Sequence, residues 1–271
     1  MNCNFSVLLS IYKKEQPEFY KQCIDSILAQ TKLPTEIVLV KDGPLTKELE
    51  EIVGICKNKF STFKVISLPV NQGLGKALNE GLKHCSYDII ARMDTDDIAK
   101  PYRFEKQLKV FQKNPDVDIV SSWIDEFEDS TSNVISTRKL PENHDEIYKY
   151  AQKRNPINHP VVMFRKTAVE AAGGYKHFPL FEDYYLWVRM LLNGARFYNI
   201  QESLLFFRFS QDMFKRRGGF AYACTEAKFL WHIYRLGMVG LGMTCVNIPL
   251  RFFTRIIPNQ LRSWMYKKIL R

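Results

Sequence analysis

Residues 36–44 read EIVLVKDGP, a short apolar run that ends at an Asp-Gly-Pro turn signal. Similar apolar runs lie at residues 5–11, 63–68 and 88–93. Between the runs, apolar residues recur at helical spacing, as in residues 17–30. Strands that are apolar along most of their length and that alternate with helices predict a mostly parallel sheet flanked by helices, an α/β fold.

Polar side chains follow these predicted strands at their carboxyl ends. They are Ser10, Tyr12, Asp42, Asn71, Asp94 and Asp96. In a parallel α/β sheet the ligand crevice lies beyond the carboxyl ends of the strands. The sequence therefore predicts a binding site at this edge of the sheet.

The pattern is less regular after residue 97. The spacing of apolar residues predicts helices at 101–113, 166–172 and 183–193, strands at 117–121 and 160–164, and a loop at 130–144. No internal repeat interrupts this order.

The composition excludes several classes of protein. The chain has 271 residues, 46% of them hydrophobic, which is ordinary for a folded domain and excludes wholesale disorder. No apolar run of about 18 residues predicts a membrane span, and the first residues do not resemble a secretory signal. The six cysteines are scattered without a C-x-x-C pair, so we expect reduced thiols in a cytoplasmic protein.

The positive charge is concentrated at the end of the chain. Residues 221–271 carry eight Lys or Arg and one acidic residue, Glu226, mixed with many apolar residues. This composition predicts a helical basic tail on an anionic membrane surface. Nucleic acid is not an expected partner, because the apolar content is high and no nucleic-acid motif is present. A helical pair that packs on the catalytic domain or on a second subunit is the alternative.

Residues 94–97 read DTDD and form the most distinctive chemical motif. Three carboxylates within four residues repel one another, and a hard divalent ion such as Mg²⁺ or Mn²⁺ would relieve that repulsion. A solvated acidic turn is the simpler alternative. Ala99 stands where an EF-hand loop needs glycine, and Ile98 does not fit a phosphohydrolase that works through an aspartyl phosphate.

Several segments together resemble the inverting nucleotide-sugar glycosyltransferases of family 2, which have the GT-A fold. The matching segments are SVLLSIYKKE (6–15), EIVLVKDGP (36–44), NQGLGKALNEGL (71–82), ARMDTDD (91–97), NPINHPVVMFRK (155–166), GGY (173–175), FEDYYLWVRMLLNG (181–194) and LLFFRFSQDMFKRRGG (204–219). The match keeps its order over roughly residues 4–219 and most resembles bacterial enzymes that build amylovoran, capsule and O-antigen repeat units. Two departures stand out: Lys76 is the nearest cation where the family often has arginine, and Ser210 and Gln211 stand where a histidine is often found.

The resemblance implies a division of the chain. Residues 1–219 would form a Rossmann-like GT-A domain, with residues 1–97 as its nucleotide-binding half and residues 98–219 as its acceptor half. Residues 220–271 would form the amphipathic basic tail.

The resemblance also assigns the donor site. Ser10 and Tyr12 would line the nucleotide base, and Asp42 would accept a hydrogen bond from the imide N–H of the base. Lys76 would lie near the diphosphate, where a cation offsets negative charge. Asp42 also suits a turn before Gly43, and Lys76 also reads as a solvated helix lysine.

For the metal, the resemblance implies Mn²⁺ or Mg²⁺ held by Asp96, with Asp94 binding the ribose or assisting the metal. The ion would act as a Lewis acid on the leaving nucleoside diphosphate.

For transfer, the resemblance makes Asp183 the base that takes the proton of the acceptor hydroxyl, with Glu182 assisting. A helix cap is the alternative role for Asp183. His159 would line the sugar pocket or serve the structure alone. Arg208 would contact phosphate or the acceptor, and the cluster at residues 215–217 would suit an anionic acceptor or be merely solvated.

The resulting hypothesis is a metal-dependent inverting glycosyltransferase. Its donor would be a UDP- or dTDP-sugar, and its acceptor a saccharide linked to polyprenyl diphosphate at the inner face of the cell membrane. Two alternatives remain: a catalytically silent subunit that binds nucleotide sugar or glycan on the same fold, and a D-x-D phosphohydrolase working from Asp94.

Overall fold

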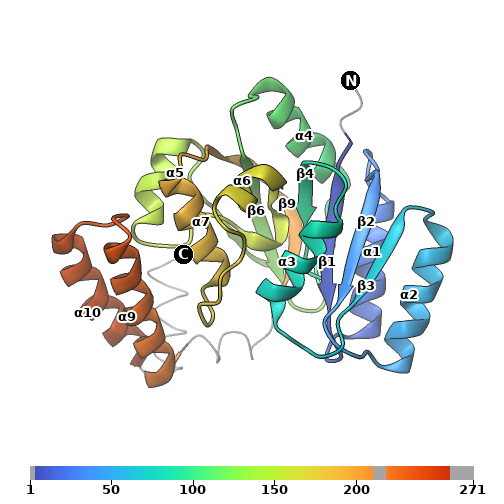
Figure 1. The fold of residues 1–271 in the computed structure, drawn as a ribbon, viewed down its shortest axis with the longest axis horizontal. Coiled ribbons are helices and arrows are strands. Elements are labelled where there is room, and N and C mark those ends of the chain that lie inside the picture. The colour runs from blue at the N-terminus through green and yellow to red at the C-terminus, as the bar shows by residue number, and fades with distance from the viewer. Residues whose placement is uncertain (1–3, 210–217, 257–271) are drawn as a thin grey trace. The chain divides into compact units, whose positions relative to one another are not determined.

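The computed structural model describes residues 4–209 and 218–256 (Figure 1). The chain divides into two compact units. The first unit comprises the residues up to 177 together with 182–208, and the second comprises residues 178–181 and those from 209 onward. The site residues expected between Ser10 and Arg208 all belong to the first unit.

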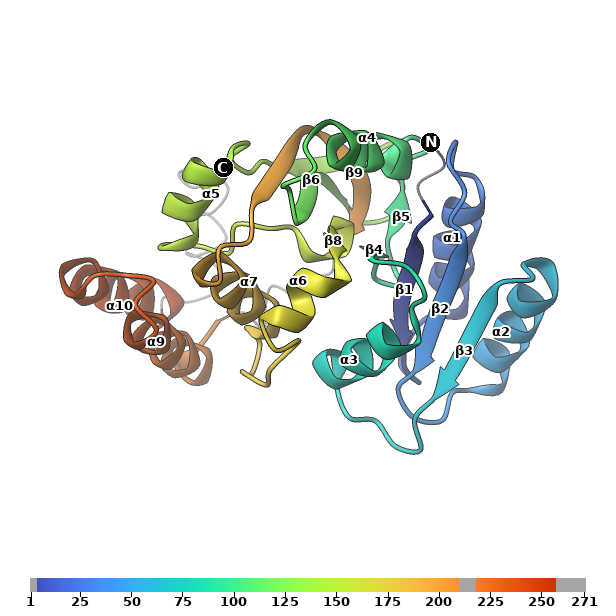
Figure 2. The ribbon, with the colours of Figure 1, turned by 45° about the horizontal axis from the view of Figure 1, so that its top comes forward.

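The first half of the first unit alternates strands and helices. Four strands, β1 (Ser6–Ile11), β2 (Glu36–Lys41), β3 (Phe63–Ser67) and β4 (Ile89–Arg92), lie in the order β3-β2-β1-β4 with parallel neighbours. The helices between them are α1 (Pro17–Leu28), α2 (Lys47–Lys59) and α3 (Leu74–His84). Figure 2 shows these helices beside the blue and cyan strands. Leu8 pairs with both Val38 and Arg92, which fixes the carboxyl ends of β1, β2 and β4 at one edge.

The second half of the first unit continues the same sheet. Its elements are β5 (Ile98–Ala99), α4 (Arg103–Lys113), β6 (Ile119–Phe127), β7 (Val134–Arg138), α5 (His144–Ala151), the 3₁₀ turn η1 (His159–Val161), β8 (Met163–Arg165), α6 (Lys166–Ala171), α7 (Glu182–Leu192) and β9 (Phe197–Arg208). The order runs on from β4 through β8, β6 and β9 to β5, and β7 pairs with β6. Strand β8 is antiparallel to β4 and β6, whereas β6 and β9 are parallel.

The predicted fold class is confirmed, with differences of detail in the second half. Residues 130–144 were expected to be a loop, yet β7 lies within them and pairs with β6 at the edge of the sheet. This expectation was wrong because β7 is largely exposed and polar, so it lacks the apolar run that marks a buried strand. The strand expected at 160–164 begins instead as the turn η1, since Pro160 lacks the N–H that a strand ladder needs.

Close packing holds α3 on the sheet. Leu8 and Val40 are fully buried beneath the helix. A Cβ atom added at Gly81 would lie 2.4 Å from Leu8 Cδ1 and 2.8 Å from Val40 Cγ2. Only glycine lets the helix approach the sheet this closely, and that approach sets the position of the first turn of α3.

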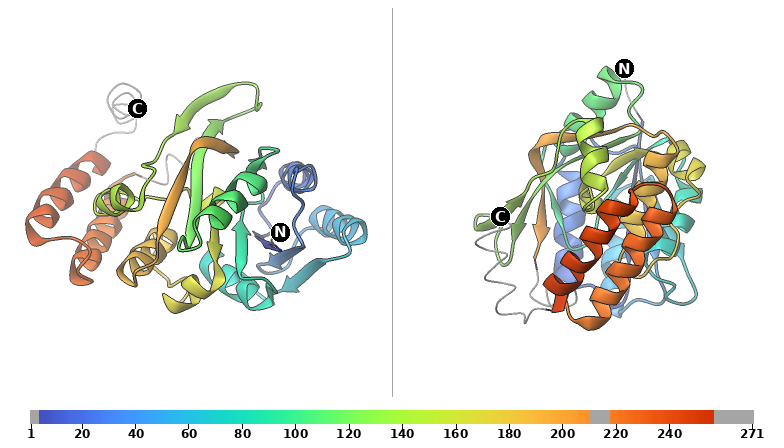
Figure 3. Two further views of the ribbon diagram at one scale, coloured as in Figure 1. Left: turned by 90° about the horizontal axis from the view of Figure 1, so that it is seen from above. Right: turned by 90° about the vertical axis from the view of Figure 1, so that its left-hand side faces the viewer.

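The second unit contains two helices, α9 (Phe220–Arg235) and α10 (Leu241–Ile256), which lie side by side (Figure 3). Glu226 of α9 is buried and bonds Arg251 Nη1 at 2.6 Å and Arg255 Nε at 2.7 Å, both on α10. Among the described helices, none combines the length and the apolar character needed to cross a membrane.

Candidate functional site

Asp42, which directly follows β2, joins the end of that strand to the start of α3. Its backbone N–H donates to the carbonyl of Ile11 at 2.8 Å, so the ends of β1 and β2 lie together. Its carboxylate accepts the backbone N–H groups of Gln72 at 2.7 Å and Gly73 at 3.0 Å, at the start of α3. The turn needs Gly43, because its φ is +88° and an added Cβ would lie 2.8 Å from a backbone nitrogen.

The other residues expected around the nucleotide lie at the end of β1 and at the start of α3. Ser10 is half-buried near the end of β1, and Tyr12 follows the strand with 41% of its surface exposed. Tyr12 lies close to Asp42, because Asp42 is hydrogen bonded to the residue before Tyr12. Lys76 is exposed on the first turn of α3. Contact of these side chains with a nucleotide stays a prediction.

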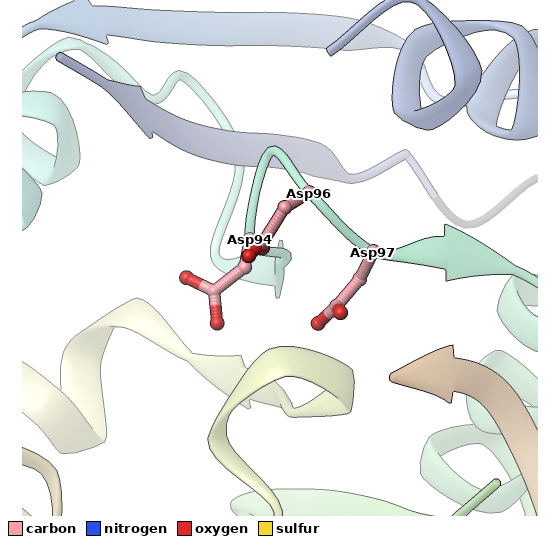
Figure 4. Close-up of side chains that lie close together, drawn as sticks. All are labelled: Asp94, Asp96 and Asp97. Atoms are coloured by element: carbon pink, nitrogen blue, oxygen red, sulfur yellow. The ribbon is translucent and has the colours of Figure 1, made fainter. Parts of the chain in front are cut away.

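An acidic cluster follows β4. Asp94, Asp96 and Asp97 can each place a carboxylate oxygen within 4.8 Å of the others (Figure 4). Arg92, whose exposure is 1%, holds Asp94 with both of its terminal nitrogens, one of them at 2.8 Å. The last residue of the strand thus orients the first carboxylate of the turn.

Two carboxyl groups of this cluster, those of Asp96 and Asp97, resist ionisation. Burial, with the nearby charges of Asp94 and Glu15, raises the pKa of Asp96 to about 7. Burial and the charges of Asp96 and Asp94 hold the pKa of Asp97 well above its ordinary value. Burial also raises the pKa of Glu15, although a hydrogen bond from the Thr95 hydroxyl opposes that shift. The four carboxyl groups of Glu15, Asp94, Asp96 and Asp97 thus lie close enough for their negative charges to repel one another.

The donor set fits a hard divalent cation. Oδ2 of Asp97 is buried and has no hydrogen-bond partner among residues 4–209 and 218–256. A buried carboxylate oxygen without a partner is costly, and a cation ligated by carboxylate oxygens would satisfy it. Asp94, Asp96 and Asp97 are therefore the residues that would hold Mg²⁺ or Mn²⁺.

Arg208, the last residue of β9, braces the acidic turn. Its backbone N–H donates to Asp97 Oδ1 at 2.8 Å, and its Nε donates to the carbonyl of Asp96 at 2.9 Å. Its Nη2 donates to Gln22 at 2.7 Å, and the guanidinium lies 3.8 Å from the centre of the Phe19 ring. The structure therefore gives Arg208 a supporting position, and the expected contact with phosphate or acceptor stays a prediction.

The second acidic group opens helix α7. Asp183 Oδ2 accepts a hydrogen bond from Asn155 Nδ2 at 2.7 Å, and Oδ1 accepts the N–H of Tyr184 at 2.7 Å. Asp183 is already the second residue of the helix, so it does not stand in the cap position that precedes one. Burial and the charge of Asp183 raise the pKa of Glu182, whose carboxylate lies 3.7 Å from His177 Nδ1.

Tyr175 is a buried residue that contacts His159. Its buried hydroxyl lies 2.8 Å from His159 Nε2. Burial raises the pKa of this hydroxyl, and the charges of both Asp183 and Asp94 contribute to the rise. Burial and the Arg92 charge keep the pKa of His159 well below its ordinary value, so this imidazole is neutral.

Helix α3 reaches across to this second group. The side chain of Asn79 accepts the backbone N–H of Tyr175 at 2.8 Å and donates to the carbonyl of Tyr175 at 2.7 Å. A Cβ added at Gly75 would lie 3.4 Å from Tyr175 Cβ and 3.7 Å from Glu182 Cγ. The helix whose cap residue, Gly73, binds Asp42 therefore also packs on the start of α7.

Sequence reasoning missed several residues of this arrangement. Glu15, Arg92, Asn155 and Tyr175 each lie in a matching segment but carry no chemical signal of their own, since their importance depends on contacts with distant residues. Asp97 was part of the acidic motif but received no role. Ser210, Gln211 and the cluster at residues 215–217 lie outside the described residues.

Comparison with known sequences gives a consistent result. The model of glycosyl transferase family 2 matches residues 6–172. A UDP-Gal:alpha-D-GlcNAc-diphosphoundecaprenol beta-1,3-galactosyltransferase of Escherichia coli is 40% identical over 98% of this chain and 96% of its own length. The amylovoran biosynthesis glycosyltransferase AmsE of Erwinia amylovora is 36% identical over 97% of this chain and 98% of its own length.

Comparison with solved structures supports the same fold. Residues 1–349 of S. aureus TarS, in complex with UDP-GlcNAc, superpose with a TM-score of 0.65 at 14% identity, covering 99% of this chain and 76% of that one. The mannosyltransferase PcManGT of Pyrobaculum calidifontis, with GDP-Man and Mn²⁺, gives a TM-score of 0.62 at 14% identity over 96% of this chain and 71% of that one. From its sequence match and its GT-A fold, the chain belongs to glycosyl transferase family 2 and is a glycosyltransferase.

Proposed function

We propose that the chain transfers a sugar, with inversion, from a nucleotide sugar to a hydroxyl group of a saccharide linked to polyprenyl diphosphate. One observation carries the proposal, the position of α3. Its cap residue Gly73 donates its N–H to Asp42 at 3.0 Å and its Gly75 packs on Tyr175 and Glu182, so the end of β2 and the start of α7 lie against one helix. The E. coli relative, whose name specifies a UDP-Gal donor and a diphosphoundecaprenol-linked acceptor, supports the substrate class.

In the proposed reaction, the acceptor oxygen attacks the anomeric carbon from the face opposite the diphosphate. The bond between that carbon and the diphosphate oxygen breaks, and its electron pair leaves with the nucleoside diphosphate. Asp183 takes the proton of the acceptor hydroxyl. Its carboxylate is held by the Asn155 amide and by the N–H of Tyr184, each at 2.7 Å, so it presents a fixed oxygen to the acceptor.

Asp94, Asp96 and Asp97 would hold the divalent cation, Mn²⁺ or Mg²⁺. When bound, that cation offsets the negative charge that develops on the departing diphosphate. Arg92 keeps Asp94 oriented toward the cluster, and Arg208 holds the backbone of the turn through the Asp96 carbonyl.

The donor nucleotide would lie at the ends of β1 and β2. Tyr12 and Ser10 would flank a uracil or thymine base, and the Asp42 carboxylate would accept its imide N–H. Both carboxylate oxygens already accept one backbone N–H each, which fixes their direction while leaving lone pairs for the base. Lys76 would approach the diphosphate from the first turn of α3. The lipid-linked acceptor would place the enzyme at the inner face of the cell membrane.

The test compares the wild type with Asp183→Asn. A panel of nucleotide sugars with Mn²⁺ first identifies the donor by its protection against thermal unfolding. We expect the variant to lose turnover by about 10²–10⁴-fold, because the amide cannot take the proton, while its protection by the donor is unchanged. Asp129→Asn, at an exposed aspartate distant in sequence from both acidic groups, is the control and keeps full turnover.

Three outcomes would overturn the proposal. Unchanged turnover in Asp183→Asn would remove the base. Release of inorganic phosphate in place of nucleoside diphosphate would indicate a phosphohydrolase. A wild type that binds the donor without turnover of any saccharide acceptor would indicate a silent binding subunit. Inversion itself is read by NMR, since an α-linked donor must give a β-linked product.

A further inference from the structure

The outward side of helix α10 carries only apolar or uncharged residues. Its exposed residues are Leu241, Gly242, Cys245, Val246, Pro249, Leu250, Phe253 and Ile256. They recur at the three- and four-residue spacing of one helix face, and we call this set the outer face of α10. The exposure is large: 64% for Val246, 61% for Leu250 and 67% for Phe253.

The charged residues of the same helix point the other way. Arg251 and Arg255 contact Glu226, which is buried on α9. Although burial would raise the pKa of Glu226, the hydrogen bonds and charges of Arg255 and Arg251 lower it, so the glutamate stays ionised. A helix that faced only water would show the opposite pattern, with its arginines outside and its apolar residues inside. The outer face of α10 is therefore built to be covered.

The outer face is too extensive to be incidental. Sixteen residues of helix span about 24 Å, and an uninterrupted apolar stripe of that length exceeds the scattered exposed residues of ordinary soluble surfaces. An exposed apolar surface of this kind marks a contact with a membrane or with another protein.

The charge of the surrounding chain distinguishes between these two occupants. From residue 218 to residue 271 the sequence contains eight Lys or Arg, and its single acidic residue is Glu226. Lys228, Trp231 and Arg235 are exposed on α9 at three- and four-residue spacing, so they share one face of that helix. A second copy that packed through the same segment would bring like charges together, because the one carboxylate there, Glu226, already pairs with Arg251 and Arg255, whereas anionic lipid supplies the opposite charge.

We infer that the outer face of α10 inserts into the headgroup region of an anionic bilayer, with the exposed cations of α9, Lys228 and Arg235, close to the lipid phosphates. The inference deepens the proposed function, whose acceptor is lipid-linked, but its observations come from the second unit alone. It is an interfacial mode of binding, in which affinity grows with the apolar area that is buried and with the anionic lipid content.

The test is binding of the full chain to vesicles. The variant Leu250→Ser/Phe253→Ser removes apolar area from the outer face without changing charge. The matched control, Leu33→Ser/Ile55→Ser, makes the same kind of change at exposed apolar residues of the first unit. In cosedimentation with vesicles that contain phosphatidylglycerol, we expect the first variant to bind roughly 30-fold more weakly and the control to bind as the wild type does. On vesicles of phosphatidylcholine alone, all of them should bind more weakly.

A second measurement places the outer face directly. Cys245 belongs to it, so a fluorescent probe attached there, in a chain carrying Cys3→Ser and Cys224→Ser, reports what surrounds it. We expect iodide to quench the probe without vesicles and to lose access when anionic vesicles are added.

Four results would overturn the inference. They are equal vesicle binding by both double variants, a probe that vesicles leave accessible, a probe already shielded without vesicles, and a dimer in sedimentation that only the α10 variant dissociates. The last two would assign the face to the chain itself or to a second copy.

The inference and the proposed function can fail separately. Turnover of a water-soluble acceptor with a short alkyl chain should be unchanged in Leu250→Ser/Phe253→Ser. Vesicle binding, in turn, should be unchanged in Asp183→Asn.

Discussion

Asn155 controls how the proposed base is presented, and its removal is the sharpest test at the level of single residues. Its Nδ2 donates to Asp183 Oδ2 at 2.7 Å, so Asn155→Leu releases one oxygen of the carboxylate. We expect kcat to fall by about 10–100-fold with the KM for the donor unchanged, because positioning affects the chemical step. The control is Asn193→Ala. Asn193 lies just beyond the end of α7, and its side-chain amide donates to the Ala171 carbonyl.

Asn155→Asp separates positioning from mere packing. Two carboxylates at hydrogen-bond distance cannot both ionise easily, so the acidic limb of the pH–rate profile should move to higher pH. A profile that keeps its shape and position in this variant would indicate that Asn155 serves only the packing around α7.

The pKa of Asp96, about 7, gives a second prediction at this scale. In protein stripped of divalent ions with EDTA, the folded carboxyl keeps its proton to about pH 7, whereas the unfolded one loses it near pH 4. The folded state therefore binds more protons between these values, and its stability falls as the pH rises through this window. Asp96→Asn should thus raise the melting temperature of the stripped protein at pH 8 and much less at pH 5.

Mn²⁺ should reduce or reverse the difference in melting temperature between Asp96→Asn and the wild type at pH 8. Added at pH 8, it should raise the melting temperature of the wild type and leave that of Asp96→Asn nearly unchanged. Asp129→Asn is again the control, and an equal effect of Asp96→Asn at both pH values would contradict the prediction.

The candidate site was predictable where chemistry is written in a short motif. The DTDD turn could be proposed from the sequence because three carboxylates in four residues are unusual, whereas the Glu182-Asp183 pair was proposed through the family resemblance. Arg92, Asn155 and Tyr175 could not, because an arginine, an amide or a phenol gains its role only from a partner that folding brings near. Arg208 shows the same difficulty, since its hydrogen bond to the Asp96 carbonyl joins residues that are far apart in the sequence.

At the level of elements, the contact between α3 and the sheet predicts opposite results for two glycines. In Gly81→Ala the new Cβ would overlap Leu8 and Val40, both fully buried, so we expect a loss of about 1–3 kcal/mol of unfolding free energy. In Gly54→Ala on α2 no atom lies within 4 Å of the added Cβ, so we expect a gain of about 0.5–1 kcal/mol. Chemical denaturation measures both, and equal signs would contradict the packing.

The elements also show where prediction from sequence stops. Strands β1, β2 and β4 are buried on both faces and read as apolar runs, which is why their order along the chain could be predicted. Strand β9 has twelve residues and mixes polar with apolar ones, because it is buried at its beginning and exposed in its middle. Its pairing with β6 also contains register shifts. A strand with changing burial has no single period, so neither the alternating nor the continuous pattern identifies it.

For the whole molecule, we expect the ion pairs of the second unit to affect its protease resistance without affecting turnover. Glu226→Gln removes the negative charge with which both Arg251 and Arg255 pair. Because a buried group that loses its partner is destabilising, we expect the free energy of unfolding to fall by about 1–3 kcal/mol. We expect trypsin to cleave between residues 218 and 256 faster in this variant, while turnover of a water-soluble acceptor is unchanged. Glu202→Gln is the control, because its partner Lys106 lies on the surface and such pairs contribute little.

The contribution of Glu226 also has a defined pH dependence. Because its pKa is lowered in the folded state, the stabilisation is complete above the ordinary glutamate pKa and is lost as the pH falls through the lowered one. The variant and the wild type should therefore converge in protease resistance at acidic pH and differ most near neutrality. A constant difference across this range would contradict the role of the ion pair.

The two hydrogen bonds between Asn79 and Tyr175 join residues that are 96 positions apart. A ribosome adds roughly 5–20 residues per second, so Asn79 is synthesised about 5–20 seconds before Tyr175. During that interval Asn79 lacks the backbone partner that it has in the folded protein. The contact between α3 and the segment before α7 can therefore form only after Tyr175 has been synthesised.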